Sequence, residues 1–467
     1  MFTRYLFLLV SFSVLISGCT SSRQYRTNYE LCQSKFDAPS SCATSAIRSE
    51  SLADGSNYLL GFVEFDDQGQ LWDRRQMAAV VDTLSEKAAG NDLLIVVFAH
   101  GWQHNAAPGD GNIETFRKVL AKLSEDEKYI SQLSGKPART VAGVYLGWRG
   151  ESISIPLLNN LTFWDRKNTA EKVGHGAVTE VFSRLEQLKR DKESTDSGKN
   201  SVRMVSVGHS FGGLVLHTAL SQMLANRFVR TTGPDGIQAD VDKFGDLVVL
   251  INPAFQAQLF STLSDMSAER GTYFNSQMPV MAVLTSEADY ATRYAFPAGR
   301  WVSTLFEKTR DTTRWNAATK TQETISESET NVDAVGHFAP YRTHKLYPAP
   351  TVNADKAASL NSSESIGSAL SAAAAWEDDK PGSKIQFTGV TLERENSSVG
   401  RNPYLVISVD RKLIRDHNDI DDPRVVEFIK QLITLSVISP EKKAVLYKAV
   451  DVPPQTQSSP IESNQAP

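Results

Sequence analysis

Short apolar runs alternate with amphipathic stretches along most of the chain. Continuous apolar runs are typical of strands that are buried on both faces, and they occur at 93–98, 140–146, 202–207, 247–251, 279–284 and 404–409. Between these runs apolar residues recur at helical spacing, over 76–88, 113–125, 169–192, 212–225 and 423–435. The alternation predicts an α/β fold in which a mostly parallel central sheet is covered by helices on both faces.

Three segments depart from this alternation. Residues 298–403, with an Ala/Ser-rich stretch at 353–376, show no clean succession of strands and helices, so we expect a long insertion before the last strand. Such an insertion either shapes or covers a functional site or forms a partly ordered surface excursion. Residues 19–56 are polar and predict a tether, and the Pro-, Ser- and Gln-rich residues 451–467 predict a disordered tail. The folded domain is then expected over 57–450.

The first eighteen residues have the pattern of a secretory signal peptide. Arg4 precedes a mostly apolar run that is too short to span a bilayer, and small residues follow that run. The stretch 16–19 (ISGC) resembles the bacterial lipobox. This resemblance implies cleavage before Cys19, attachment of diacylglycerol to its sulfur and, because Thr20 and not Asp follows, the outer membrane over the inner one. We expect the protein to face the periplasm, although the sequence leaves open which leaflet of the outer membrane holds the anchor. The alternative is an ordinary cleaved signal peptide followed by an unrelated cysteine.

The two other cysteines, Cys32 and Cys42, lie close together within the predicted tether. An even pair in an oxidising compartment predicts a disulfide. The alternative is two free thiols in an unstructured leader.

Composition narrows the class of partner. The chain has 467 residues, with 49 basic and 54 acidic side chains and a formal net charge of −5. This balance lacks the clustered basic excess of a nucleic-acid-binding protein. The sequence has no phosphate-binding glycine loop, dinucleotide fingerprint or zinc-protease helix. We therefore expect no nucleic-acid partner, no metal and no cofactor, whereas the oligomeric state is not indicated.

The clearest chemical signal is the segment 205–213 (VSVGHSFGG), in which an apolar strand runs into Gly-x-Ser-x-Gly and then into an amphipathic helix. Small residues two positions before and after Ser210 permit a sharp turn that holds the hydroxyl above the sheet. Ser210 is therefore the predicted nucleophile. The backbone N–H of Phe211, at the start of the helix, is one predicted oxyanion donor.

The strand at 93–98 ends in Ala99-His100-Gly101-Trp102, which resembles the His-Gly oxyanion loop of α/β hydrolases. By this resemblance the Trp102 N–H is the second oxyanion donor, Gly101 permits close backbone approach, and His100 is a structural loop residue. The order of His-Gly loop, serine turn, acid and histidine resembles that of the α/β-hydrolase superfamily over about residues 57–436. Segments 147–150 and 161–167 look like those of bacterial esterase-like hydrolases, but their residue types indicate no chemical role.

The acid of a catalytic triad is expected at the end of a strand that follows the serine. The run 279–284 ends in a Ser-x-x-Asp loop that resembles the acid loop of the superfamily, which makes Asp289 the leading candidate. Glu287 lies two residues away and could serve instead. Asp246 or Asn252, at the neighbouring strand, would suit a relocated acid.

The base is expected beyond the last strand and after the acid, so three of the eight histidines remain: His337, His344 and His417. His417 lies between the strand at 404–409 and the closing amphipathic helix, which matches the terminal strand-loop-helix unit of the superfamily. His337 is the alternative base, because its Gly-His-Phe context also resembles a catalytic loop, although it falls inside the insertion.

This constellation predicts a serine hydrolase of the carboxylesterase or lipase-like kind, which cleaves a small-molecule or lipid ester through an acyl-enzyme. The apolar patch at 301–306 could form a lid or contact acyl chains, although such patches are commonly core. Two other functions stay open. One is an amidase or peptidase of the same fold, and the other is a non-catalytic envelope lipoprotein that serves in binding or as a scaffold.

Overall fold

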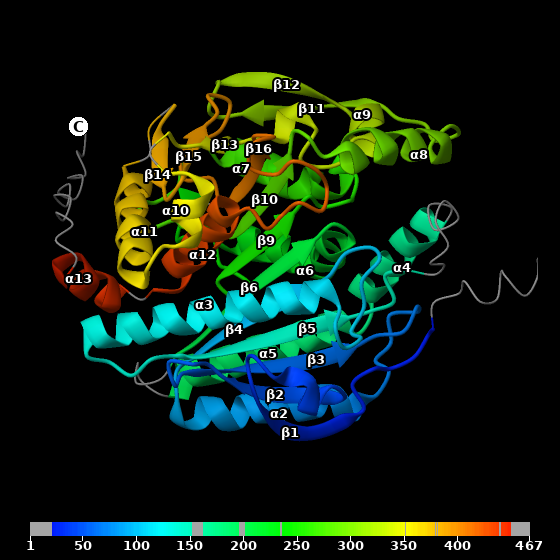
Figure 1. Ribbon diagram of the computed structural model, residues 1–467. Coiled ribbons are helices and arrows are strands. Elements are labelled where there is room, and N and C mark those ends of the chain that lie inside the picture. Colours follow the sequence, from blue (N-terminus) through cyan, green and yellow to red (C-terminus); the bar gives the residue numbers. More distant parts are fainter. Residues whose placement is uncertain are drawn as a thin grey trace, which may run out of the picture.

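The structure, a computed structural model, describes residues 21–151, 162–195, 201–233, 236–350, 352–378, 380, 382–438 and 440–449. The predicted signal peptide, Cys19 and the tail from residue 451 lie outside these residues. Within them, a large sheet runs through the centre of the molecule with helices on both faces (Figure 1).

Parallel strands make up the middle of this sheet. Its order across the described residues is β1-β2-β3-β5-β4-β6-β9-β10-β16-β13-β15-β14, and neighbours from β3 to β13 are parallel. The central members are β3 (Asn57–Glu64), β5 (Thr140–Gly147), β4 (Leu93–Ala99), β6 (Val202–His209), β9 (Leu247–Ile251), β10 (Met281–Ser286) and β16 (Tyr404–Val409). All six predicted strands are present, with ends shifted by at most two residues. The α/β class is confirmed, and the topology is compatible with the α/β-hydrolase fold.

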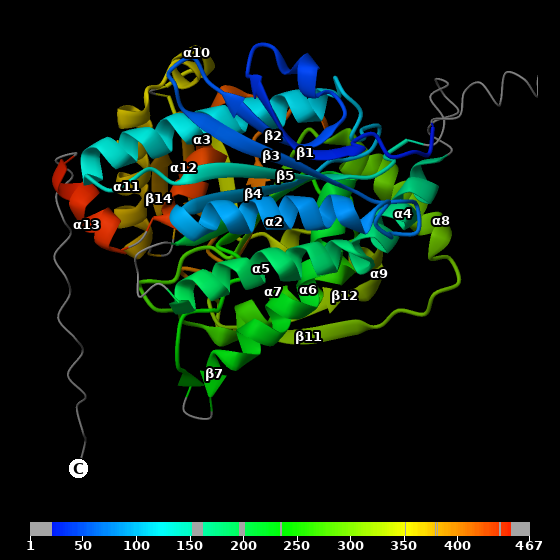
Figure 2. The ribbon, with the colours of Figure 1, turned by 90° about the horizontal axis from the view of Figure 1, so that it is seen from below.

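Two layers of helices cover the sheet, and each buries its own apolar cluster. One face carries α2 (Arg74–Gly90), α4 (Phe163–His175), α5 (Val178–Thr195), α6 (Phe211–Arg230) and α7 (Ser261–Arg270). The other face carries α3 (Gly111–Ser134), α11 (Ser362–Glu377) and α12 (Pro423–Val437). Figure 2 shows α2, α5 and α6 side by side below the strands. The single helix predicted over 169–192 is wrong, because the glycines at 174 and 176 divide it into α4 and α5.

The shorter elements complete the described chain. They are η1 (Pro39–Cys42), β7 (Thr232–Gly233), β8 (Gly236–Ile237), η3 (Ala257–Phe260), η4 (Ala291–Ala295), α9 (Glu327–Val332), η5 (Ala339–Tyr341), α10 (Ala354–Ala358) and α13 (Pro440–Ala449). None of the described helices combines the length and apolarity that a membrane crossing needs.

The predicted tether is wrong between residues 28 and 51, where the chain forms two strands of the central sheet. β1 (Asn28–Lys35) pairs in parallel with β2 (Ser45–Ser51), which pairs antiparallel with β3. The polar composition of this segment led to the wrong prediction, because β2 buries charged side chains together with their partners. Glu50 accepts hydrogen bonds from Arg117 of α3 and from the Tyr58 hydroxyl. A charged strand can be buried when its charges are paired and hydrogen-bonded.

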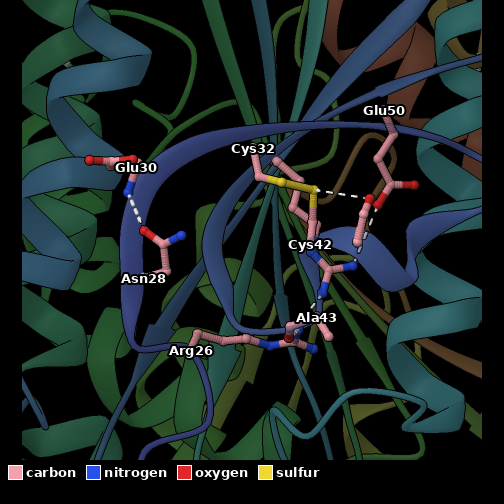
Figure 3. Close-up of a disulfide and its surroundings, with 9 residues drawn as sticks. Arg26, Asn28, Glu30, Cys32, Cys42, Ala43 and Glu50 are labelled. Atoms are coloured by element: carbon pink, nitrogen blue, oxygen red, sulfur yellow. Dashed lines mark hydrogen bonds and ion pairs between the residues drawn. A yellow bond between two sulfur atoms is a disulfide. The ribbon is translucent and has the colours of Figure 1, made fainter.

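The predicted disulfide between Cys32 and Cys42 is present (Figure 3). It joins β1 to the end of η1, the short turn that leads into β2. Arg26 lies below it in the same view and donates a hydrogen bond to the Ala43 carbonyl oxygen. A disulfide and a buried arginine thus hold the segment that connects β1 to β2.

The insertion at 298–403 is an extension of the sheet and not a surface excursion. It supplies β13 (His344–Pro348), β14 (Lys384–Phe387) and β15 (Val390–Arg394), which continue the sheet beyond β16. It also forms a hairpin of β11 (Asp311–Asn316) and β12 (Thr321–Ser326), preceded by α8 (Phe296–Ser303). The last strand in sequence, β16, is therefore internal, and both of its neighbours are parallel to it.

Candidate active site

Ser210 lies in a tight turn between β6 and α6. It has φ 56° and ψ −120°, a backbone conformation that costs a residue with a side chain on the order of 1–3 kcal/mol. Two glycines permit the turn: a Cβ at Gly208 would lie 2.6 Å from the Gly212 carbonyl oxygen, and a Cβ at Gly212 would overlap the Ala99 carbonyl oxygen of β4. The observed turn has the strand-to-helix geometry that the motif predicts.

The side chains of Ser210, His417 and Asp289 form one continuous hydrogen-bonded chain. His417 Nδ1 lies 2.8 Å from Asp289 Oδ2, and His417 Nε2 lies 2.7 Å from Ser210 Oγ. An ionised carboxylate only accepts hydrogen bonds, so Nδ1–H donates to Asp289 and Nε2 accepts from the serine hydroxyl. The three residues come from the ends of β6 and β10 and from the loop after β16, at the same edge of the sheet.

Asp289 is completely buried and is held by a second set of donors. Thr292 donates its backbone N–H to Asp289 Oδ1 at 3.1 Å and its hydroxyl to Oδ2 at 2.5 Å. Burial raises the pKa of Asp289, but the hydrogen bond and charge of His417 and the bonds from Thr292 outweigh it and place that pKa below its ordinary value. The carboxylate is therefore the stable form.

His337, the alternative base, lies behind the acid. Its Nε2 lies 2.9 Å from Thr292 Oγ1. Because the Thr292 hydroxyl donates to Asp289, its oxygen accepts from His337 Nε2–H. Burial lowers the pKa of His337 to about 4, so the ring is neutral at pH 7. The geometry thus brings His417, and not His337, to the serine. His337 is the last member of the hydrogen-bonded series that begins at Ser210.

The backbone carbonyl oxygen of His417 is a second anchor point for the base. It accepts from His209 Nε2–H and from Asn252 Nδ2–H, each at 3.0 Å. The Asn252 side chain also accepts from the Ser286 N–H at 2.9 Å, at the end of β10. Burial lowers the pKa of His209 to about 3, so this ring is a neutral donor. The loop that carries His417 is therefore tied to β6, β9 and β10.

The loop after β4 is fixed by residues 147–150, for which the sequence analysis predicted no chemical role. The Trp148 N–H donates to His100 Nε2 at 3.0 Å, and its indole N–H donates to the His100 carbonyl oxygen at 3.1 Å. Gly150 exchanges backbone hydrogen bonds with Gln103 and His104. His100 is fully buried, and burial lowers its pKa to about 4. It is the structural loop residue that the resemblance implies.

The two predicted oxyanion donors lie on neighbouring turns beside the serine. Phe211 is the first residue of α6, where the N–H has no intrahelical acceptor. Trp102 follows Gly101, and a Cβ at Gly101 would lie 2.9 Å from the Ser210 Cβ. The glycine therefore lets the loop after β4 approach the nucleophile turn as closely as backbone atoms allow.

Aromatic residues at the start of α4 support both turns. The Phe163 ring lies 4.7 Å from the Phe211 ring and 5.5 Å from the Trp102 indole, measured between centroids. Trp164 contacts Phe163 at 5.3 Å and Phe296 of α8 at 5.6 Å. The segment 161–167, whose described part begins at residue 162, thus supplies part of the wall of the site.

The other candidates lie elsewhere. Asp246 precedes β9 and accepts from the Met204 N–H, so it sits at the opposite edge of the sheet. The Glu287 carboxylate lies 3.5 Å from the Ser408 hydroxyl, whereas Asp289 contacts His417. His344 is buried in β13 against Trp376. Within the described residues, no group of three or more His, Cys, Asp or Glu side chains is placed to hold a metal ion.

A mostly apolar cavity of about 170 Å³ lies on the face of the sheet covered by α3 and α12. His209 and Asn418, the sequence neighbours of Ser210 and His417, border it. Its walls come largely from β4, β6 and the two helices, through Val96, Phe98, Phe116, Val207, Ile429 and Ile433. The loops that carry these two residues therefore border a space suited to a hydrocarbon group, whereas Ser210 and His417 are not among the residues that line it.

Sequence reasoning missed several supporting residues, namely Thr292, His209, Trp148, Phe163 and Trp164. Thr292 stands three residues after the acid, the spacing at which an aspartate commonly accepts a hydrogen bond from a backbone N–H at the start of a helical turn. That signal was available. The other residues act through contacts between segments far apart in the sequence, which no local pattern reveals.

The sequence matches no protein-family model and no curated protein. Solved structures that resemble the fold include phospholipase PlaB from Legionella pneumophila, at 13% identity and a TM-score of 0.28; the match covers 77% of this chain and 62% of that one. Trichoderma reesei cutinase in complex with a C11Y4 phosphonate inhibitor matches at 13% identity and a TM-score of 0.18, over 46% of this chain and 76% of the cutinase. The chain thus spans less than two thirds of the phospholipase, and neither likeness is high enough to bear on its function.

Stability should fall as the pH falls from about 6.5 to about 4. Burial lowers the pKa from 6.5 to about 3 or 4 for four histidines: His100, His209, His217 and His337. In this window the unfolded chain binds protons that the folded chain does not, so the free energy of unfolding decreases with decreasing pH and is fully present above 6.5. Each histidine contributes up to about 1.4 kcal/mol per pH unit.

Urea unfolding at pH 7.5 and pH 5.5 measures this loss, which we expect to be at least about 2 kcal/mol. His217 stacks on Phe255 outside the catalytic loops, so His217→Phe should remove one titrating group and reduce the loss by about 1 kcal/mol. An unfolding free energy that stays constant over this range would contradict the assignment of neutral, buried rings.

Proposed function

We propose that the protein is a serine hydrolase that cleaves carboxylic esters through an acyl-enzyme. The observation that carries the proposal is the hydrogen-bonded chain Ser210–His417–Asp289, with 2.7 Å and 2.8 Å between its members. A nucleophile within reach of a base, which is itself oriented by a carboxylate, is the arrangement that activates a serine hydroxyl.

The reaction follows from the positions of these groups. Ser210 Oγ attacks the carbonyl carbon of the ester while its proton passes to His417 Nε2. Asp289 stabilises the resulting imidazolium through its bond with Nδ1–H, and the N–H groups of Trp102 and Phe211 stabilise the oxyanion. The alcohol leaves with the proton from Nε2. Water then attacks the acyl-enzyme with His417 as base, which releases the acid and restores the serine.

The acyl part of the substrate is proposed from a cavity near the loops that carry Ser210 and His417. The cavity beside His209 and Asn418 has mostly apolar walls and offers space for the acyl part of the substrate. A cavity of about 150 Å³ with apolar walls binds a molecule of the size of benzene, so a space of about 170 Å³ suits a short acyl chain.

We further propose that the enzyme is anchored to the bacterial envelope through acyl chains on Cys19, in the outer membrane and facing the periplasm. The stretch 16–19 and the preceding apolar run support this proposal. The bonded pair Cys32–Cys42 fits an oxidising compartment.

Replacing the nucleophile should abolish turnover without unfolding the protein. We expect Ser210→Ala to lower kcat on p-nitrophenyl esters by about 10³-fold or more and to prevent labelling by a fluorophosphonate probe. Ser221→Ala, on the surface of the same helix α6, is the matched control and should keep both. Wild type that takes no label would favour the non-catalytic alternative, and labelling with activity on amides alone would favour an amidase or peptidase.

Removing the hydroxyl that holds the acid should slow the chemical step. Thr292→Val deletes the donor to Asp289 and the acceptor of His337 while keeping the shape of the side chain. We expect kcat to fall about 10-fold with KM nearly unchanged, and Thr292→Ser to restore most of it. A loss that parallels a drop in the unfolding midpoint, or that serine does not rescue, would make Thr292 merely structural.

The anchor predicts a defined N-terminal mass. The mature protein should begin at Cys19, with diacylglycerol on its sulfur, and Cys19→Ser should leave the signal peptide uncleaved. Mass spectrometry of the N-terminal peptide tests both statements. A mature N-terminus elsewhere, or an unmodified Cys19, would contradict them.

A further inference from the structure

Large apolar side chains are exposed along one short stretch directly after the catalytic acid. Six of the thirteen large apolar residues exposed in the described part of the chain fall within residues 290–306. They are Tyr290, Tyr294, Trp301, Val302, Leu305 and Phe306, of which Trp301 is 61% and Phe306 is 99% exposed. We call these six residues the 290–306 surface. Such concentration marks an interaction site, because isolated apolar residues are the normal state of a protein surface.

The buried side of this stretch fixes its orientation. Phe296 is fully buried and packs on Trp164, and Gly299 lies so close to the same indole that a Cβ would overlap it. The Arg300 side chain donates to the Asn331 carbonyl oxygen at 2.8 Å. Since α8 is held in this way, the side chains of the 290–306 surface point away from the core and are accessible to a partner.

Basic residues accompany the apolar ones. Arg293 and Lys308 are exposed within or beside the surface, and the single acid between residues 290 and 310 is Glu307. Arg310 is also exposed and forms an ion pair with Glu327, next to the exposed Asp311. A short helical stretch with Trp, Tyr, Leu and Phe beside Lys and Arg fits the boundary of a bilayer, where apolar side chains enter the acyl region and cations meet anionic headgroups.

The surface lies at the end of the molecule that carries the catalytic loops. In Figures 1 and 2 the helices α8 and α4 lie at the same end as the first described residues of the chain. The arrowheads of β3 and β5 point to that end in Figure 1. Residues 21–25 also lie against Glu64 and Gly147, the last residues of these two strands. The first described residues, the catalytic edge and the 290–306 surface therefore share one side.

We propose that the 290–306 surface docks on a lipid bilayer that contains anionic phospholipids. Docking by η4 and α8 turns the catalytic edge of the sheet toward the membrane. The docking itself is independent of catalysis. The consequence that the ester is a membrane lipid rests on the proposed function, and it gives the substrate class as acyl esters presented at the bilayer.

The test follows Trp301 in the full chain, reconstituted with vesicles of phosphatidylcholine and phosphatidylglycerol. Its emission is obtained as the difference between wild type and Trp301→Phe. We expect brominated acyl chains to quench this difference signal at least twofold relative to unbrominated vesicles, and the quenching to weaken when phosphatidylcholine replaces phosphatidylglycerol. The measurement uses Ser210→Ala protein as well, so failure of the hydrolase proposal leaves the result unchanged.

Matched variants distinguish the contribution of the 290–306 surface from that of the N-terminal anchor, because the anchor is the same in all of them. Leu305→Ser with Phe306→Ser should abolish the quenching of Trp301. Val229→Ser with Phe274→Ser removes two exposed apolar residues near the opposite edge of the sheet and should change nothing. The same signal from brominated and unbrominated vesicles overturns the proposal. Two other outcomes also overturn the proposal in favour of another occupant. One is a dimer, seen by light scattering, that dissociates in Phe306→Ser, and the other is a Trp301 that is already shielded from solvent without lipid.

Discussion

The site depends on two segments of the chain whose backbones lie in direct contact, with no side chain between them. Gly212, in the first turn of α6, lies against the Ala99 carbonyl oxygen at the end of β4, and Gly101 lies against Ser210. Any Cβ at these positions would push the nucleophile turn away from the loop that carries Trp102. The contact explains why segments about 110 residues apart in sequence carry matching glycines, and why the loop after β4 must be held rigidly from its other side.

That support is made of hydrogen bonds to backbone atoms. Trp148 holds both the ring and the carbonyl oxygen of His100, while His209 and Asn252 hold the carbonyl oxygen of His417. A hydrogen bond contributes about 1 kcal/mol net, so a few of them offset the backbone strain of the serine turn. Because carbonyl oxygens are bound, the imidazole of His417 stays free to exchange protons with Ser210 while its main chain is fixed.

The sequence predicted the parts of this structure that repeat a local pattern. All six predicted strands have continuous apolar runs, and Ser210, Asp289 and His417 each follow such a run at one edge of the sheet. β3 also has an apolar run and was not predicted, but the other missed parts lack that pattern. β2 buries Glu50 against a helix far along the chain, and the hydrophobic signal is absent where charge is buried in pairs. Thr292 and His337 are joined by a contact over 45 residues, which only the fold creates.

The insertion illustrates the same limit and links the two proposals. Its residues lie outside the strand-helix alternation, yet His337 reaches back to Thr292, which holds the acid, and α8 packs on Trp164. Trp164 in turn contacts Phe163, which touches the rings of both predicted oxyanion residues. The apolar surface and the oxyanion turns are thus two ends of one aromatic row. The rings of Phe296, Trp164 and Phe163 therefore place the proposed docking surface and the oxyanion turns in one continuous set of contacts.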